Sequence, residues 1–129
     1  MKLQLSGLSG AQAAALLTFT GYGSGYVLVN GARHETNLIV TPERLLAWEA
    51  DDFDTLTEQH FAALAALRPE VVLLGSRAKL RFPHPRLSMS LARARIGVEV
   101  MDTQAACRTY NILAAESRRV LAALFISRD

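Results

Sequence analysis

The 129-residue sequence predicts an α/β domain with three layers and a mixed central sheet. The first forty residues contain short extended segments separated by glycines, which is typical of antiparallel strands. Beyond residue 70, three strand-like runs alternate with two helical patterns in the order β-α-β-α-β. That alternation is typical of right-handed crossovers on a sheet that is at least partly parallel. A chain of this length usually has one hydrophobic core, so we expect residues 1–129 to form a single domain.

The N-terminal third is expected to be antiparallel. Strands are expected over three segments, residues 16–20, 26–30 and 37–41. Gly21, Gly23 and Gly25 lie between the first two segments and predict a turn there, because glycine reaches positive φ at little cost. A dinucleotide-binding loop needs a helix after its glycines, whereas a strand-like segment follows here, so a hairpin is favoured. Residues 42–54, around the only tryptophan, are expected to be an irregular crossing segment.

A helix and a buried strand are expected in the middle of the chain. Thr55 and Glu58 have the spacing of a capping box, in which a hydroxyl and a carboxylate bond free amides at a helix end. We therefore expect a helix over residues 56–67, with Pro69 preventing its continuation. Residues 71–74 form a continuous apolar run before Gly75, which indicates a strand covered on both faces.

A second helical pattern follows a loop over residues 76–83. Pro85 suits the first position of a helix, since its missing N–H has no partner to lose there. Leu87, Leu91 and Ala94 then recur at i, i+4 and i+7, which predicts an amphipathic helix.

The last three elements complete the alternation. Strands are expected over residues 96–101 and 120–126. Between them, Asp102 or Thr103 is expected to cap a helix that continues to about Glu116, because short polar side chains at this position bond the free amides of the first turn.

Composition narrows the class of protein. Half of the residues are apolar and a fifth are charged, which is ordinary for a globular domain and unlike a disordered chain. No apolar run approaches the roughly 18 residues of a membrane helix, and residues 1–6 lack the pattern of a secretory signal. A single cysteine cannot form an internal disulfide, which agrees with a reducing compartment. We therefore expect a cytoplasmic protein without a transmembrane segment.

Charge is divided between two segments of the chain. Six acids lie between residues 41 and 60: Glu43, Glu49, Asp51, Asp52, Asp54 and Glu58. Six bases and no acid lie between residues 71 and 98: Arg77, Lys79, Arg81, Arg86, Arg93 and Arg95. The charges could neutralise each other, form opposed faces or be solvated, and solvation is the default interpretation. Nucleic-acid binding is disfavoured, because the net charge is only +2 and Phe82 is the only aromatic residue among these bases.

The candidate site lies where two strands end. Ligands of open α/β sheets collect beyond the carboxyl ends of parallel strands, where loops meet helix N-termini. The strands ending near residues 75 and 101 are expected to be neighbours and to share this edge, which we call the rim. The residues expected to bind a small anion or a partner there are Ser76, Arg77, Asp102, Thr103, Cys107, Arg108 and Asn111. Helix-end amides and arginines favour an anion, whereas a capping Asp102 opposes it.

No catalytic residue, metal site or cofactor is expected. Cys107 lies near the start of its helix, where the dipole favours a thiolate, and His34 or His84 could serve as its base. No spacing ties either histidine to it, so a small buried packing residue is the favoured interpretation. One cysteine and three scattered histidines do not form a zinc pattern.

One stretch of the sequence resembles a known family. Its matching residues are Gly97, Val98, Glu99, Val100, Met101, Asp102, Thr103, Ala105, Ala106, Cys107, Arg108, Thr109, Tyr110, Asn111, Glu116 and Arg118. Supporting residues are Gly21, Tyr22, Gly23, Gly25, Val40, Pro42, Trp48, Leu74 and Gly75. Together they resemble a small bacterial family of unknown function that includes the mitochondrial NADH:ubiquinone oxidoreductase complex assembly factor 3 and an adipogenesis-associated domain protein.

The resemblance implies a fold and a type of function. It implies a three-layer domain with a mixed sheet, no established catalytic activity, and relatives that assist assembly of a membrane respiratory complex. Arg77 departs from the family, which usually has a second glycine in that turn, and this argues against close approach of a ligand to the backbone there. The leading hypothesis is a non-catalytic protein-binding or assembly module in respiratory-complex or membrane-protein biogenesis, with an unidentified protein partner. The alternative is a small-molecule or anion binder, or an enzyme, that uses the rim around Cys107 and Arg108.

Overall fold

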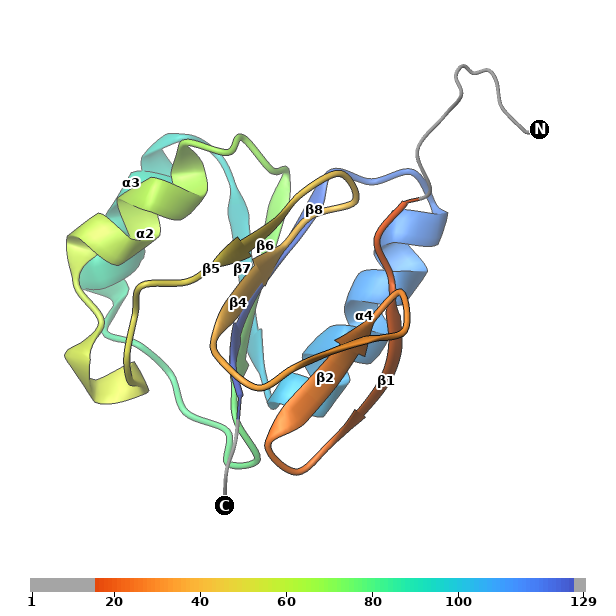
Figure 1. Ribbon diagram of the computed structural model, residues 1–129. Helices are drawn as coiled ribbons and strands as arrows, with labels where there is room; N and C mark the ends of the chain where they lie inside the picture. Colours follow the sequence, from red (N-terminus) through yellow and green to blue (C-terminus); the bar gives the residue numbers. More distant parts are fainter. Residues whose placement is uncertain (1–15, 127–129) are drawn as a thin grey trace.

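The computed structural model describes residues 16–126, which form two β-sheets and three α-helices (Figure 1). The expectation of no secretory signal rests on residues 1–6, outside this range. A three-stranded antiparallel sheet contains β1 (Phe19–Gly23), β2 (Tyr26–Val29) and β3 (Ala32–His34). A five-stranded sheet contains β4 (Leu38–Val40), β5 (Leu45–Ala47), β6 (Val71–Ser76), β7 (Gly97–Met101) and β8 (Val120–Phe125). The helices are α2 (Glu58–Ala65), α3 (Met89–Arg93) and α4 (Thr103–Ala115), with 3-10 turns η1 (Phe53–Thr55) and η2 (Pro85–Ser88).

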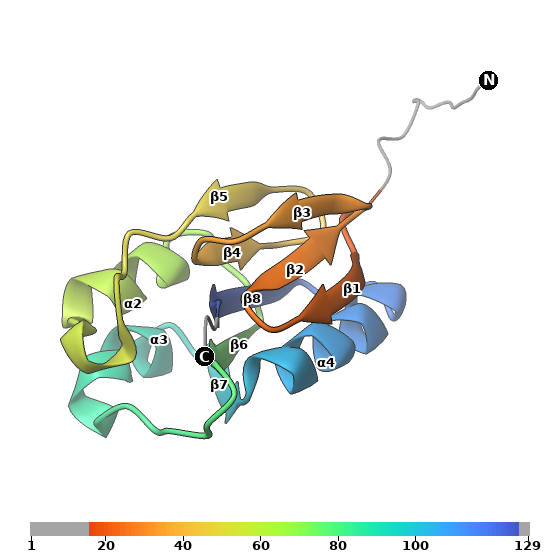
Figure 2. The same cartoon turned by 60° about the horizontal axis from the view of Figure 1, so that its bottom comes forward.

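The larger sheet is mixed and central, as predicted. Its order is β5-β4-β8-β6-β7, with β6 parallel to both β7 and β8, and β4 antiparallel to both β8 and β5. Helices α2 and α3 cover one face, and α4 with the small sheet covers the other (Figures 1 and 2). Every residue of β6 and β8 is buried, because these strands are covered on both faces. The three-layer mixed-sheet prediction is therefore confirmed.

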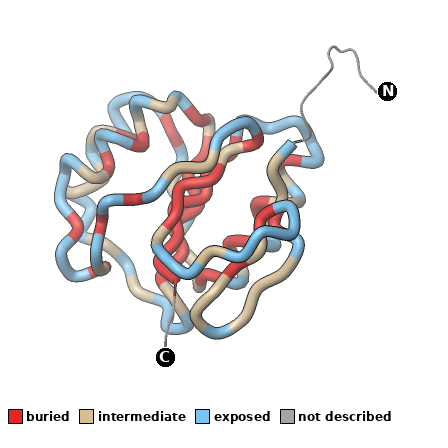
Figure 3. The backbone as a smooth tube through the Cα atoms, in the orientation of Figure 1, coloured by how far each residue is buried: buried red, intermediate tan, exposed pale blue. Residues whose placement is uncertain are grey.

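Buried residues concentrate on the central strands (Figure 3). On the face toward α4 and the small sheet, the rings of Phe19 and Tyr110 meet edge to face with centroids 5.0 Å apart. On the face toward α2 and α3, Phe125 packs against Trp48 at 4.8 Å and Phe53 at 5.9 Å. The sheet thus separates two apolar clusters, and each face must be covered for the fold to be stable.

The glycine-rich turn is shorter than predicted. Strand β1 continues to Gly23, and the chain reverses at Ser24 and Gly25, where Gly25 has a φ of 81°. Gly23 serves a different purpose, since a Cβ there would lie 2.5 Å from the ring of Tyr26. The missing side chain makes room for an aromatic ring across the hairpin.

Two short strands and the start of α2 differ from the sequence prediction. Strand β3 includes His34, which precedes the third expected strand, and β5 lies within the segment expected to be irregular. The capping box is formed two residues later than expected: the Thr57 hydroxyl accepts from the His60 amide at 3.4 Å, and His60 Nδ1 accepts from the Thr57 amide at 3.0 Å. The Thr55 hydroxyl instead bonds the Asp52 carbonyl within η1. Residues 85–93 form η2 followed by the short helix α3 rather than one continuous helix.

Candidate functional site

The ends of β6 and β7 meet the start of α4 at the rim, as their parallel pairing requires. The hydroxyl of Ser76 lies 2.9 Å from the Lys79 carbonyl and 3.3 Å from the Met101 carbonyl, and it accepts from the Arg81 amide at 3.3 Å. This buried hydroxyl therefore fixes the loop after β6 against the end of β7.

Thr103 joins three parts of the rim. Its buried hydroxyl donates to the Phe125 carbonyl at 2.7 Å and accepts from the Arg77 amide at 2.8 Å. Its own amide donates to the Arg77 carbonyl at 2.8 Å. One side chain thus positions the start of α4 against the loop after β6 and the end of β8.

A pocket of about 320 Å³ opens beside these residues. It is bounded by the tip of the β1–β2 hairpin, the loop after β6, the start of α4 and the end of β8. Its lining residues are Tyr22, Gly23, Ser24, Tyr26, Val27, Arg77, Ala78, Asp102, Thr103, Gln104 and Ile126. We call it the rim pocket. Its hairpin wall was not predicted, because the contact between the small sheet and α4 has no signal in local sequence.

Tyrosine and arginine side chains pair around this pocket. Arg108 donates to the Tyr22 hydroxyl at 3.0 Å, and that hydrogen bond is the main cause of the raised pKa of the Arg108 guanidinium. Tyr26 lies on β2, the other strand of the hairpin. The guanidinium of Arg33, on β3, lies 4.0 Å from the centroid of the Tyr26 ring, which is a cation–π contact. Arg108 is therefore held toward the hairpin.

The start of α4 has little spare capacity for an anion. Asp102 caps the helix, and its carboxylate accepts from the Ala105 amide at 2.8 Å. The Thr103 amide is bonded to Arg77, so only the Gln104 amide of the first three lacks a partner among the described residues. The arrangement leaves the Gln104 amide and the Arg77 side chain for a ligand, opposed by the Asp102 carboxylate.

Arg77 adopts an unusual backbone conformation with a φ of 71°. Positive φ favours glycine, which explains physically why a glycine suits this turn and why Arg77 carries backbone strain. The guanidinium pairs with Asp52 at 3.6 Å, while its buried Nε has no hydrogen-bond partner among the described residues. Arg81 similarly pairs with Asp54. Two ion pairs thus join the acidic and basic segments, whereas the other acids and bases of these segments form no ion pair among residues 16–126, in agreement with the default interpretation of solvated charges.

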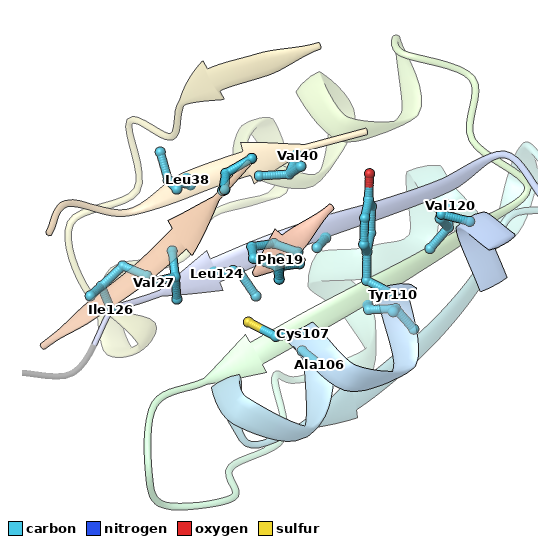
Figure 4. Packing of buried hydrophobic residues seen from close by; sticks show 14 of the residues in the cluster. Phe19, Val27, Leu38, Val40, Ala106, Cys107, Tyr110, Val120, Leu124 and Ile126 are labelled. Atoms are coloured by element: carbon cyan, nitrogen blue, oxygen red, sulfur yellow. The ribbon is translucent and has the colours of Figure 1, made fainter. Parts of the chain in front are cut away.

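Cys107 and Asn111 face away from the rim pocket. Cys107 is completely buried between α4 and the central sheet, and burial raises the pKa of its thiol to about 12 (Figure 4). Asn111 bonds both backbone groups of Phe19, accepting at 2.9 Å and donating at 2.7 Å, so it attaches β1 to α4. His84 Nδ1 accepts from the Arg86 amide, and no hydrogen bond joins His34 or His84 to the thiol in residues 16–126. The favoured interpretation of Cys107 as a buried packing residue is confirmed.

Between residues 16 and 126, no group of three or more histidine, cysteine, aspartate or glutamate side chains could hold a metal ion. In the same range, no helix has the length and apolar character needed to cross a bilayer.

Comparisons with known proteins identify a family. The model of the family described as "Protein of unknown function (DUF498/DUF598)" matches residues 19–125. An uncharacterized protein of Rhodobacter capsulatus is 37% identical over 113 residues, which cover 86% of each chain. The mouse NADH dehydrogenase (ubiquinone) 1 alpha subcomplex assembly factor 3 is 31% identical over 80% of this chain, and the match spans 57% of that protein. A 13 kDa major membrane protein of Francisella tularensis is 29% identical over 79% of this chain and 85% of its own length.

Solved structures share the fold. A crystal structure of a Bordetella parapertussis protein superposes with a TM-score of 0.84 at 40% identity, covering 89% of this chain and 99% of that one. The solution structure of a Bordetella pertussis protein described as an Mth938-like domain gives a TM-score of 0.77 at 35% identity, covering 100% and 94% of the two chains. The architecture described above is therefore also found in experimental structures.

Proposed function

Because this chain belongs to the DUF498/DUF598 family of proteins of unknown function, we propose that it is a non-catalytic protein-binding module that assists assembly of a membrane respiratory complex. The mouse relative is named as an assembly factor for NADH dehydrogenase, and the Francisella relative as a membrane protein. These names support an assembly role for a membrane complex. The match spans only 57% of the mouse protein. That this chain acts on the same kind of complex is therefore part of the proposal.

The observation that carries the proposal is the lining of the rim pocket. Tyrosine and arginine are the side chains that most often dominate binding at protein interfaces, and Tyr22, Tyr26 and Arg77 all line this pocket. Arg108 and Arg33 pack on the two tyrosines and restrict their motion before any partner binds. Restricting side chains in advance lowers the entropy lost on association. We propose that a protein partner places a side chain in the rim pocket.

The chemistry of the pocket supports binding over catalysis. Cys107, the strongest nucleophile candidate, is buried and does not line the pocket, and its raised pKa keeps the thiol protonated. The expected cytoplasmic location stays part of the proposal, supported by this single cysteine being a free thiol.

Site-specific photo-crosslinking of the full chain in its own cells tests this function. A photoreactive phenylalanine replaces Tyr26 or Gln104 at the pocket, and Ala115, exposed at the far end of α4, provides the control position. We expect both pocket positions to crosslink to one protein of a respiratory complex or of its assembly machinery, and Ala115 not to do so. Crosslinking to the same protein with equal yield at Ala115, or no protein crosslink at either pocket position, would contradict the proposal.

Binding of a small anion or of an acidic side chain at the same rim is the second candidate. The unpartnered Nε of Arg77 and the free amide of Gln104 favour it, whereas the Asp102 carboxylate opposes it. We therefore expect weak, salt-sensitive binding, since a cap and a helix-end charge each contribute about 1 kcal/mol. Titration with phosphate, sulfate or acetate should shift the amide resonances of residues 76–78 and 103–108 together. Independent or non-saturating shifts would exclude this site.

A further inference from the structure

A second segment, which leads from the loop after β6 into α3, carries several exposed apolar side chains. Leu80 is 51% exposed, Phe82 69% and Met89 43%, and they are three of the five large apolar residues exposed in the described range. All three lie within the ten residues that lead from the loop after β6 into α3. Figure 2 shows this segment running along the lower edge of the molecule to α3, which lies on the opposite side of the sheet from the β1–β2 hairpin. Three large apolar side chains exposed within one short segment are candidates for contact with a partner surface.

The same segment is rich in unpaired positive charge. Arg81 is fixed inward by its ion pair with Asp54 and by the Phe53 ring, whose centroid lies 4.7 Å from the guanidinium. Lys79, Arg86 and Arg93 form no ion pair among the described residues. No acid occurs between residues 71 and 98 to neutralise them. The surface therefore offers cations and apolar groups together.

A hollow of about 240 Å³ between α2 and the η2–α3 segment is lined by two of these basic side chains. Arg86, Ser90 and Arg93 are spaced at i, i+4 and i+7, and all three line the hollow. The Ser90 hydroxyl is buried and has no hydrogen-bond partner in the part of the chain that the structure describes. Glu58 is the single acid of the lining and reduces the positive potential there. Two guanidinium groups and a free hydroxyl are donors suited to a phosphate group.

We propose that the segment from Lys79 to Arg93 docks on an anionic membrane surface. Phe82, Leu80 and Met89 enter the boundary between headgroups and acyl chains, and Arg86 with Arg93 binds a lipid phosphate. A bilayer explains both features of the surface, because it presents phosphates and an apolar layer within a few ångströms of each other. A free phosphate would explain the arginines but leave the exposed aromatic and aliphatic side chains without a role.

Flotation of the full-length chain with lipid vesicles tests the proposal. Vesicles of phosphatidylcholine with about one third phosphatidylglycerol are compared with vesicles of phosphatidylcholine alone. The double variant Arg86→Gln/Arg93→Gln should bind the anionic vesicles about 30-fold more weakly, since each base near such a surface contributes about fivefold. The matched control is Arg44→Gln/Arg119→Gln, which removes the same charge from two exposed arginines elsewhere. Phe82→Ser should also weaken binding, whereas Ile112→Ser, at another exposed apolar residue on α4, should not.

Insertion has a direct readout that does not depend on affinity. A Phe82→Trp variant should show a blue-shifted emission with anionic vesicles, and brominated lipid should quench it. All variants change exposed side chains, and their melting temperatures verify folding. Three results would overturn the proposal: no binding to anionic vesicles, equal loss in the control variants, or shifts of Arg86 and Arg93 with inorganic phosphate in a chain that does not bind vesicles. The membrane-docking proposal does not depend on the rim pocket. If it fails, the protein-binding proposal still stands.

Discussion

Replacement of the Thr103 hydroxyl tests how the rim is held together. Thr103→Val keeps the shape of the side chain but removes the donor to the Phe125 carbonyl and the acceptor of the Arg77 amide. Each buried group left without a partner costs about 1–3 kcal/mol. Arg77 is partly exposed, so water can partly replace its lost bond, and we expect the free energy of unfolding to fall by about 2–4 kcal/mol.

Thr103→Ser provides the comparison, because serine keeps the hydroxyl and removes one methyl group. It should cost only about 1 kcal/mol, the value of one buried carbon. Urea denaturation followed by circular dichroism measures both variants. If the valine variant is as stable as the serine variant, the hydroxyl does not join the three segments in the way described, and the reasoning about the rim is wrong.

Four further predictions concern the rim and the buried thiol of Cys107. Gly75→Ala should destabilise the protein by about 1–3 kcal/mol in thermal or urea melts, because the added Cβ would lie 3.1 Å from a backbone atom of α4, whereas Gly97→Ala, with nothing closer than 3.9 Å, should cost far less. Arg77→Gly should be more stable than Arg77→Ala by about 1 kcal/mol, since only glycine adopts the φ of 71° without strain; equal stabilities would argue against strain there. Native Cys107 should resist alkylation below about pH 10, and rapid labelling near neutral pH would show a reactive thiol. Because burial raises its folded pKa from 9.0 to about 12, the unfolded state loses its proton first, so the free energy of unfolding should fall as pH rises through this window, by up to about 1.4 kcal/mol per unit. Burial also raises the pKa of Tyr110, which adds to the loss in the same direction.

The elements predicted best are those with a strong local signal. Residues 71–74 of β6 and all of β8 are apolar, and Asp102 stands directly before a helical pattern, so both the central strands and the α4 cap followed from sequence. Strands β3 and β5 have three residues each, which is too short for an alternating pattern to be recognised. They form because β2 and β4 offer them backbone hydrogen bonds.

The sequence predicts only one side of the candidate site, the side that is formed by the ends of β6 and β7 and the start of α4. Parallel pairing brings Arg77 and Thr103 together, and this follows from topology. The position of the hairpin does not follow, because it depends on Asn111 and Tyr110 bonding the backbone of residues 17–19, about ninety residues earlier in the chain. The way α4 packs on the sheet also decides which of its residues face the pocket and which face the core. In this packing Cys107 lies in the core.

The small sheet has no β-ladder with the large one, so individual hydrogen bonds rather than paired strands attach it to the rest of the described molecule. The hairpin is attached to α4 by side chains, chiefly Asn111, and by apolar packing around Phe19. Breaking a few such contacts costs less than unzipping a strand, so the hairpin is expected to detach as one cooperative unit while the five strands stay paired. Because the hairpin forms one wall of the rim pocket and the start of α4 forms another, detachment of the hairpin would open the pocket. Amide exchange should therefore be faster in β1 and β2 than in β6 and β8, and a partner that fills the pocket should slow it.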